Sequence, residues 1–202
     1  MKNTFCISGL LIAFAAVPAH SQSVRNWEFI AIGGVFVPQD DAIDDTYGQG
    51  PQGNVALGIP VGGRARMLVG LSYFREKGNP FLDGTSRVFN GNDTATLTFS
   101  NLSLALETHA LTGGWPRIYL GAGIDYVFAK DALIGLADGT GRSVGAHFSV
   151  KPQIKLADKL ALVTAVQYQL LEINFKSANQ RYKFDLSGTS LMAGLSYTFG
   201  RW

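Results

Sequence analysis

The segment LMAGLSYTFGRW, residues 191–202, has an apolar residue at every second position until it reaches an aromatic. In an extended strand one face would carry Leu191, Ala193, Leu195, Tyr197 and Phe199. The residues between them are mostly small or polar. This period of two predicts a β-strand with one apolar face. What that apolar face contacts decides the fold.

The N-terminal segment has the pattern of a secretory signal peptide. Lys2 precedes an apolar run at about 5–17, and the small residues Ala19 and Ser21 follow it. These features predict a signal peptide at 1–21 that is cleaved after Ser21. A buried or membrane-anchoring helix is the alternative, but the run is shorter than the ~20 apolar residues that span a bilayer.

The rest of the chain, 22–202, is predicted to form one domain. A net charge of +2 gives no basic field that indicates nucleic acid and no acidic tail that indicates disorder. The hydrophobic content is 47%. No later apolar run is long enough for a transmembrane helix. The one cysteine, Cys6, lies in the predicted signal, which excludes a disulfide framework or a cysteine metal site. A soluble β-sandwich or a transmembrane β-barrel remains.

Eight segments have strand-like patterns, and most are longer than the five or six residues typical of soluble sheets. They match the ~9–11 or more residues that a tilted transmembrane strand needs. The segments are 27–38, 52–61, 64–76, 95–110, 117–129, 144–156, 160–175 and 187–199.

The connections between these segments alternate between short and long. Short turns are expected at 62–63, 111–116 and 157–159, and long loops at 39–51, 77–94, 130–143 and 176–186. Outer-membrane barrels have short periplasmic turns and long extracellular loops. The sequence therefore predicts an all-β fold, an eight-stranded antiparallel up-and-down transmembrane barrel with the long loops outside the cell.

The expected hairpins place residues of one kind on one face. A three-residue turn at 157–159 pairs Val150 with Val166, and an odd-length turn after residue 61 pairs Ile59 with Met67. Pro152 is awkward within a strand, and we interpret it as a bulge or as the periplasmic limit of its strand.

The third hairpin, centred near Thr112, would put Glu107 directly opposite Arg117 and predicts an ion pair between them. The polar face is expected to line the lumen, while the leucines face lipid. The facing of strand 27–38 stays open, because both of its faces are apolar. The expected lumen network comprises Glu107, Arg117, Asp125, His147, Lys151, Gln153 and Gln167.

The alternation that ends at Leu195, Tyr197 and Phe199 resembles the C-terminal strand of outer-membrane proteins. In those proteins the terminal aromatic is recognised by the barrel-assembly machinery, and Phe199 fits that position, with 200–202 as an overhang. The chain from 22 onward resembles the small eight-stranded outer-membrane family of the OmpA membrane domain, OmpX and opacity-type proteins. The resemblance implies a Gram-negative outer-membrane location. It also implies outer-membrane lipids, lipopolysaccharide, the assembly machinery and periplasmic chaperones as partners, with no nucleic acid.

Members of this family share an architecture but no common biochemical activity. The function is therefore expected to be structural or directed at the cell surface: envelope integrity, adhesion, or host or phage contact. An eight-stranded barrel has room inside only for side chains, which makes a wide pore improbable. A narrow channel for small solutes is the first alternative. The prediction includes no catalytic residue, no cofactor and no metal.

A lipid A-modifying enzyme is the second alternative. His147 and Ser149 form a His-x-Ser that is similar to the motif of eight-stranded lipid A deacylases. The chain departs from that motif at Val150 and Lys151, and the only nearby acid is Asp158 in a turn. Strand parity also turns His147 and Ser149 inward, which favours a hydrogen-bonded lumen histidine.

The loops and strand ends carry charge and aromatic patterns. A solvated acidic loop is favoured over a calcium site at Asp40, Asp41, Asp44 and Asp45. The basic residues of the last loop, which could meet lipopolysaccharide phosphates, are Lys176, Arg181 and Lys183. The interfacial girdles are expected to include Trp27, Trp115, Tyr126, Phe128 and Phe175.

Overall fold

The computed structural model describes residues 27–78, 95–111, 114–133, 138–177 and 180–199. Its elements are β1 (Glu28–Pro38), α1 (Asp41–Tyr47), β2 (Gly50–Gly62), β3 (Ala65–Gly78), β4 (Ala95–His109), β5 (Arg117–Leu133), β6 (Gly139–Ala157), β7 (Leu160–Leu170), β8 (Glu172–Ser177), β9 (Gln180–Asp185) and β10 (Gly188–Thr198). The predicted signal peptide with its cleavage residues Ala19 and Ser21, and the predicted overhang 200–202, lie outside the described residues. The signal peptide and the domain boundary at 22 therefore stay predictions.

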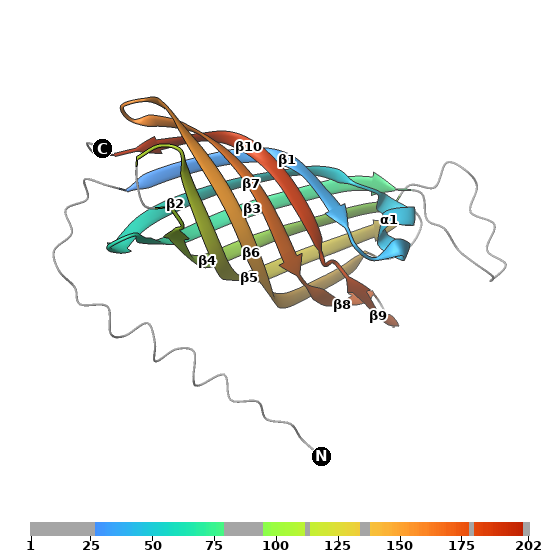
Figure 1. Cartoon of the computed structure of the whole chain (residues 1–202). Helices are drawn as coiled ribbons and strands as arrows, with labels where there is room; N and C mark the ends of the chain where they lie inside the picture. Colours follow the sequence, from blue (N-terminus) through green and yellow to red (C-terminus); the bar gives the residue numbers. More distant parts are fainter. Residues whose placement is uncertain (1–26, 79–94, 112–113, 134–137, 178–179, 200–202) are drawn as a thin grey trace, which may run out of the picture.

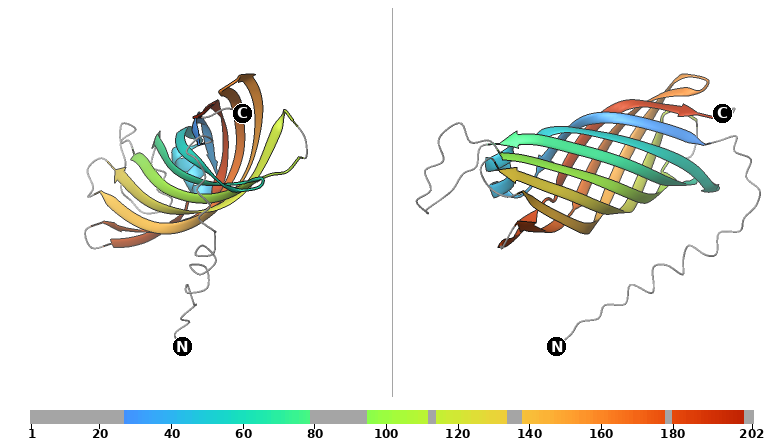
Figure 2. Two further views of the ribbon diagram at one scale, coloured as in Figure 1. Left: turned by 90° about the vertical axis from the view of Figure 1, so that its left-hand side faces the viewer. Right: turned by 180° about the vertical axis from the view of Figure 1, so that it is seen from behind.

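The strands close into a single antiparallel barrel (Figures 1 and 2). The ladder runs from β5 through β4, β3, β2, β1, β10 and β7 to β6, and the β5–β6 pairing closes it. β8 continues the line of β7 after a break at Leu171, and β9 leads into β10, so the barrel has eight strand positions. This confirms the predicted fold class. The β2–β3, β4–β5 and β6–β7 connections lie at one end, the turn end, and α1 and the β8–β9 hairpin lie at the other, the loop end.

The exterior of the barrel is apolar. Exposed fractions are 58% for Leu71, 67% for Val144, 55% for Phe148 and 50% for Leu191, and many other large apolar side chains are exposed by at least 40%. A protein surface of this kind suits hydrocarbon and would be an aggregation liability in water. The predicted outward facing of the apolar alternation is therefore confirmed. No helix in the described ranges is both long enough and apolar enough to cross a membrane.

Two of the predicted hairpin registers are confirmed. Ile59 lies opposite Met67 in the β2–β3 pair, and Val150 lies opposite Val166 in the β6–β7 pair. Each ladder shifts register by one residue next to its turn, between Pro60 and Gly62 in the first case. The side-chain pattern required an odd number of residues between the paired strands. Each hairpin provides it through a tight turn and a one-residue bulge next to the turn.

The predicted register of the β4–β5 hairpin is wrong by four residues. Glu107 lies opposite Gly121 and not opposite Arg117, whose ladder partner on β6 is Gln153. The displaced register puts His109 opposite Tyr119, so the connection closes further from Thr112 than expected. A shift of four keeps every side chain on its predicted face, because the strand period is two. The alternation therefore determines the faces without determining the pairing.

The structure settles the facing of β1 and the role of Pro152 in β6. In β1 the side chains of Glu28, Ile30, Ile32 and Phe36 are buried inside, while Phe29 is 42% exposed outside. Our interpretation of Pro152 is wrong, because β6 continues to Ala157 and its register with β7 is unchanged across the proline. The β6–β7 ladder simply lacks the pairs at 151 and 152, where the proline has no N–H to donate.

The loop end contains more strand than the long loops that were predicted. β5 and β6 extend as a ladder to Leu133 and Gly139, and β8 and β9 pair from Glu172–Asp185 to Ser177–Gln180. Much of 130–143 and 176–186 is therefore strand. The first loop contains α1, and 79–94 lies outside the described residues. Phe175 was also misassigned to a girdle: it is fully buried, because it points inward with Ile173.

Candidate functional site

A buried ionic network fills the lumen at the turn end. The guanidinium of Arg66 contacts the Glu28 carboxylate and donates to Glu107 Oε2 from Nε at 2.9 Å. The ammonium of Lys151 lies 2.6 Å from Glu107 Oε1, and Gln153 donates to Glu28 Oε1 at 3.0 Å. All five side chains are less than 10% exposed. Two carboxylates therefore face two cations, which satisfies the rule that buried charges are paired.

Tyr119 and Arg117 mark the outer limit of this network. The Arg66 guanidinium lies 3.6 Å from the centre of the Tyr119 ring, so the aromatic face closes one side of the charge cluster. Arg117 is half-buried at the rim and lies over the Trp115 ring at 4.7 Å. The predicted Glu107–Arg117 pair is wrong, since the ladder brings Arg66 and Lys151 to Glu107.

The middle of the lumen holds an aspartate–histidine pair. His147 Nδ1 lies 2.8 Å from Asp125 Oδ2, and both side chains are at most 3% exposed. Gly123 lies beside them in the β5–β6 ladder, where a Cβ would meet His147 Cε1 and Ala105 Cβ at 2.6 Å. The same Cβ would lie 2.7 Å from the backbone carbonyl oxygen of Leu104, so the close approach of β4 together with the imidazole requires the glycine.

Further polar pairs belong to the same level of the barrel. Asn101 donates to Gln169 across the lumen at 2.9 Å, and Ser190 donates to Gln52. Gln167 is buried and lies opposite Ser190 in the β7–β10 ladder. The predicted network residues therefore separate into a turn-end cluster and a mid-lumen group, with Arg117 at the rim.

The His-x-Ser motif lies inside the lumen. His147 and Ser149 are 3% and 4% exposed, and the acid that His147 meets is Asp125 rather than Asp158. Among the described residues the Ser149 hydroxyl has no hydrogen-bond partner, so it is not bonded to His147. A deacylase triad needs a nucleophile that meets lipid, which this inward placement does not provide.

The loop end of the lumen is closed by an apolar cluster. Phe36, Phe74 and Phe99 are at most 1% exposed, and their ring centres lie 4.6–5.5 Å apart. Residues from β4, β5, β8 and α1 pack on them, with Phe175 from β8 among the buried members. No polar side chain of the network penetrates this layer. The loop end of the interior is therefore apolar, while further toward the turn end a second buried apolar cluster, which includes Ile30, Leu68 and Val163, lies among the polar side chains.

Helix α1 completes the closure of the loop end (Figure 1). Ile43 and Tyr47 are buried against the apolar cluster, and the Tyr47 hydroxyl donates to Asp131 at 2.5 Å. Tyr182 of β9 donates to the other oxygen of Asp131 at 2.8 Å. Burial, followed by the hydrogen bond to this carboxylate, raises the pKa of both tyrosines. One aspartate thus ties the first and last loops to β5.

The acidic residues of the first loop have a local role. Asp40 is the N-cap of α1 and accepts the backbone N–H of Ile43 at 3.1 Å, and Asp41 and Asp44 lie in its first turn. Carboxylates at a helix N-terminus are favoured by the helix dipole. No group of three or more potential metal ligands gathers within the described residues.

The predicted assembly residues all face outward. Leu195, Tyr197 and Phe199 are 46%, 42% and 52% exposed, and the last two rings lie 5.3 Å apart. The backbone N–H of Phe199 donates to the carbonyl of Trp27, which ties the ends of the described barrel together. The side chains are accessible from the exterior, while their recognition by assembly machinery stays a prediction.

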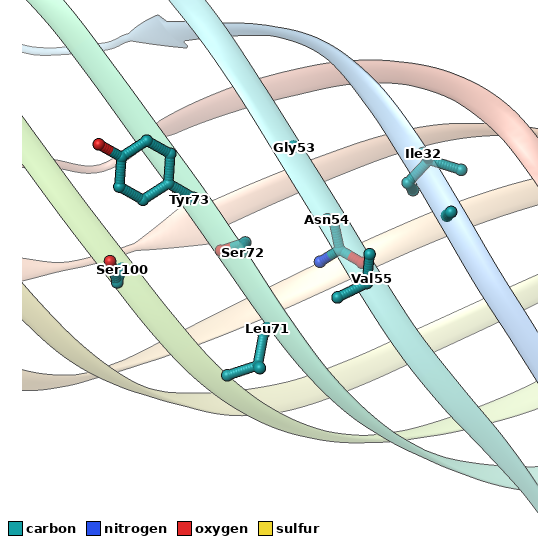
Figure 3. Close-up of a pocket in the computed structure, with 9 residues that line it drawn as sticks. Ile32, Gly53, Asn54, Val55, Leu71, Ser72, Tyr73 and Ser100 are labelled. Atoms are coloured by element: carbon teal, nitrogen blue, oxygen red, sulfur yellow. The ribbon is translucent and has the colours of Figure 1, made fainter.

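A shallow groove of about 660 Å³ indents the exterior over β1–β3 (Figure 3). Small side chains at Ala31 and Gly53 leave the sheet uncovered between Val55, Leu71 and Tyr73. The groove is lined almost entirely by apolar atoms and holds no acid, base or nucleophile apart from hydroxyls and an amide. It matches hydrocarbon rather than a reacting substrate.

Glu28 and Arg66, the two central members of the turn-end cluster, were not predicted from the sequence. Glu28 was missed because both faces of its strand are apolar. Arg66 could have been found, because the outward facing of Met67, Val69 and Leu71 turns it inward. Its pairing with Glu107 depends on the register across 77–94, which the sequence does not set.

Comparisons with known proteins agree with this architecture. No protein-family model and no curated protein matches the sequence. Among solved structures, Neisserial surface protein A has a TM-score of 0.59 at 14% identity, covering 86% of this chain and 97% of that one. OprG from Pseudomonas aeruginosa has a TM-score of 0.58 at 14% identity, with 87% and 97% covered. The attachment invasion locus protein Ail of Yersinia pestis, in complex with the heparin analogue sucrose octasulfate, has a TM-score of 0.54 at 11% identity, with 87% and 99% covered. The chain thus has the fold of the small eight-stranded outer-membrane β-barrels.

Proposed function

We propose that the protein is an outer-membrane barrel with a sealed lumen, which acts as a structural scaffold and presents its loop end to the cell exterior. The observation that carries this proposal is the double closure of the lumen. Paired charges around Arg66 and Glu107 fill the turn end, and the phenylalanine cluster with Tyr47 of α1 fills the loop end. Along the part of the lumen that the described residues line, side chains filling both ends would leave a solute no open route.

Three features support the outer-membrane location and the orientation. The exterior is apolar over the body of the barrel, the β2–β3 and β6–β7 turns are tight, and the β8–β9 hairpin extends the loop end. This asymmetry is typical of outer-membrane barrels whose long loops are extracellular. The loop end is then the surface through which adhesion, or host or phage contact, would occur.

A deletion strain provides the test. It should show a defect in adhesion, serum resistance or detergent resistance that the wild-type gene restores. A variant in which 176–181 is replaced by a short Gly-Asn turn removes the hairpin tip but keeps Phe175 and Tyr182, which are opposite each other in the hairpin. It should insert normally without restoring surface contact. Restoration by this variant would contradict the surface role. The control variant carries Lys155→Ser and Lys159→Ser at the turn end. It should correct the defect of the deletion strain as fully as the wild-type gene does.

A further inference from the structure

We propose that five cations at the loop end form a binding site for the phosphate groups of an anionic outer-leaflet lipid, chemically a phosphorylated lipid A. This inference deepens the proposed function and rests on its orientation. The basic ladder is defined as Lys130, Arg142, Lys176, Arg181 and Lys183, all of which are exposed.

The β-sheet pairing brings these residues together on one surface. Lys130 of β5 lies opposite Thr140 of β6, Thr140 lies opposite Lys176 of β8, and Lys176 lies opposite Arg181 of β9. Since neighbouring strands are about 4.8 Å apart, this row of four residues spans roughly 15 Å. Arg142 lies two residues along β6 from Thr140 and has the same facing. The basic ladder could not be predicted from the sequence, because its members are far apart in the chain and lie on four different strands.

The acids near the ladder neutralise only part of its charge. Lys130 pairs with Asp138 and Lys183 pairs with Glu172, each at 2.6 Å. Within the described part of the chain, no carboxylate lies within ion-pair distance of Arg142, Lys176 or Arg181. Asp185, which lies opposite Glu172, accepts the backbone N–H of Ser187 instead.

The direct opposition of Lys176 and Arg181 is unfavourable for the hairpin alone. Like charges directly opposite each other in an antiparallel pair destabilise it. A bound dianion would remove this repulsion and gain charge-assisted hydrogen bonds, in which arginine can bind phosphate through two N–H groups. The positive charge of the ladder would attract an anion, and a bound anion would reduce the repulsion between Lys176 and Arg181.

The position of the ladder indicates a lipid rather than a soluble anion. Directly next to it on β5 and β6 lie Phe128 and Val144, which are 43% and 67% exposed, and Tyr126, which is 41% exposed. The Arg142 guanidinium lies 5.2 Å from the centre of the Phe128 ring. Aromatic side chains of this kind mark the level of lipid headgroups. Cations that point sideways at that level face phosphates whose acyl chains can cover the apolar surface below.

Native mass spectrometry of the refolded full barrel in neutral detergent tests the inference. The protein is titrated with lipid A carrying two phosphates, one phosphate or none, and affinity should fall in that order. The triple variant Arg142→Ser, Lys176→Ser, Arg181→Ser should bind the two-phosphate form about 100-fold more weakly, since each cation contributes roughly fivefold. Equal affinity for all three lipids in the wild type would overturn the proposal without any variant.

The matched control removes the same charge at the turn end, with Arg64→Ser, Lys155→Ser and Lys159→Ser, and should leave affinity unchanged. Both variants must keep the heat-modifiable gel shift of a folded barrel. A parallel titration with sucrose octasulfate distinguishes a soluble sulfated sugar. If the ladder variant loses that ligand but keeps lipid A, the surface binds polysaccharide and the lipid assignment is wrong. Binding in detergent is independent of cellular orientation, so a failure here is separable from a failure of the proposed function.

Discussion

Truncation of Arg66 should destabilise the barrel more than truncation of a cation at the rim of the lumen, because Arg66 contacts two buried carboxylates. Its guanidinium contacts Glu28 and lies 2.7–2.9 Å from Glu107, and its side chain is 7% exposed. Two unit charges about 4 Å apart attract by about 4 kcal/mol at an effective dielectric constant near 20. The desolvation of each ion opposes this by several kcal/mol. Arg66→Ala leaves two carboxylates with one cation, and the expected loss of unfolding free energy is ~3–5 kcal/mol.

Arg117→Ala is the matched control for this experiment. Arg117 is also at the turn end, but it is half-buried at the rim and stacks on Trp115. Its truncation should cost about 1 kcal/mol or less. Urea unfolding in detergent or lipid, followed by tryptophan fluorescence, measures both variants.

A double-mutant cycle measures the coupling energy of each arginine with Glu107 separately from the destabilisation that each single substitution causes. Arg66→Ala and Glu107→Ala should couple by about 2 kcal/mol or more, whereas Arg117→Ala and Glu107→Ala should add to within about 0.5 kcal/mol. If the coupling belonged to Arg117 and not to Arg66, the β4–β5 register and the assigned charge network would both be refuted.

Three further outcomes are expected. Cysteines at Asp44 and Asp138 should react with an impermeant thiol reagent in whole cells, while a cysteine at Asp158 should react only after lysis; the reverse pattern would invert the topology. Phe199→Ala should lower the yield of heat-modifiable barrel, whereas deletion of 200–202 should not, and the opposite result would show that the terminal aromatic was assigned wrongly. Since burial and Asp131 raise the pKa of Tyr47, the stability from that hydrogen bond is complete below pH ~10 and is lost as the pH rises further. Tyr47→Phe should flatten this alkaline loss in urea unfolding, and an unchanged slope would argue against the contact.

The facing of side chains was predictable from sequence because it depends only on the strand period. Leu191 and Leu195 alternate with buried Ser190 and Ser196, and the structure places them as the pattern requires. Short turns also determined the register where bulky apolar residues reached close to the turn, as Ile59 and Met67 do.

The pairing of distant strands was not predictable, for a physical reason. Register across a long or irregular connection is set by side-chain packing and not by turn geometry. The β4–β5 hairpin has glycines at 121 and 123, which give little pattern to anchor the pairing, and the error of four residues there preserved all facings. The closure at the loop end was missed for a related cause. Tyr182 belongs to β9, where a loop had been expected, and Phe175, which had been assigned to a girdle at the end of its strand, points into the lumen.

The claim of a sealed lumen is tested most directly by single-channel recording of the purified barrel in a planar lipid bilayer. The paired charges around Glu107 and the stacked rings of Phe74 and Phe99 predict no conductance steps above the baseline of the protein-free membrane. Heat-modifiability of the same sample should verify that the barrel is folded. Reproducible steps from the folded protein, which the small replacement Phe74→Ala leaves unchanged in size, would contradict the account, because ions would then be passing a region that the structure shows as filled.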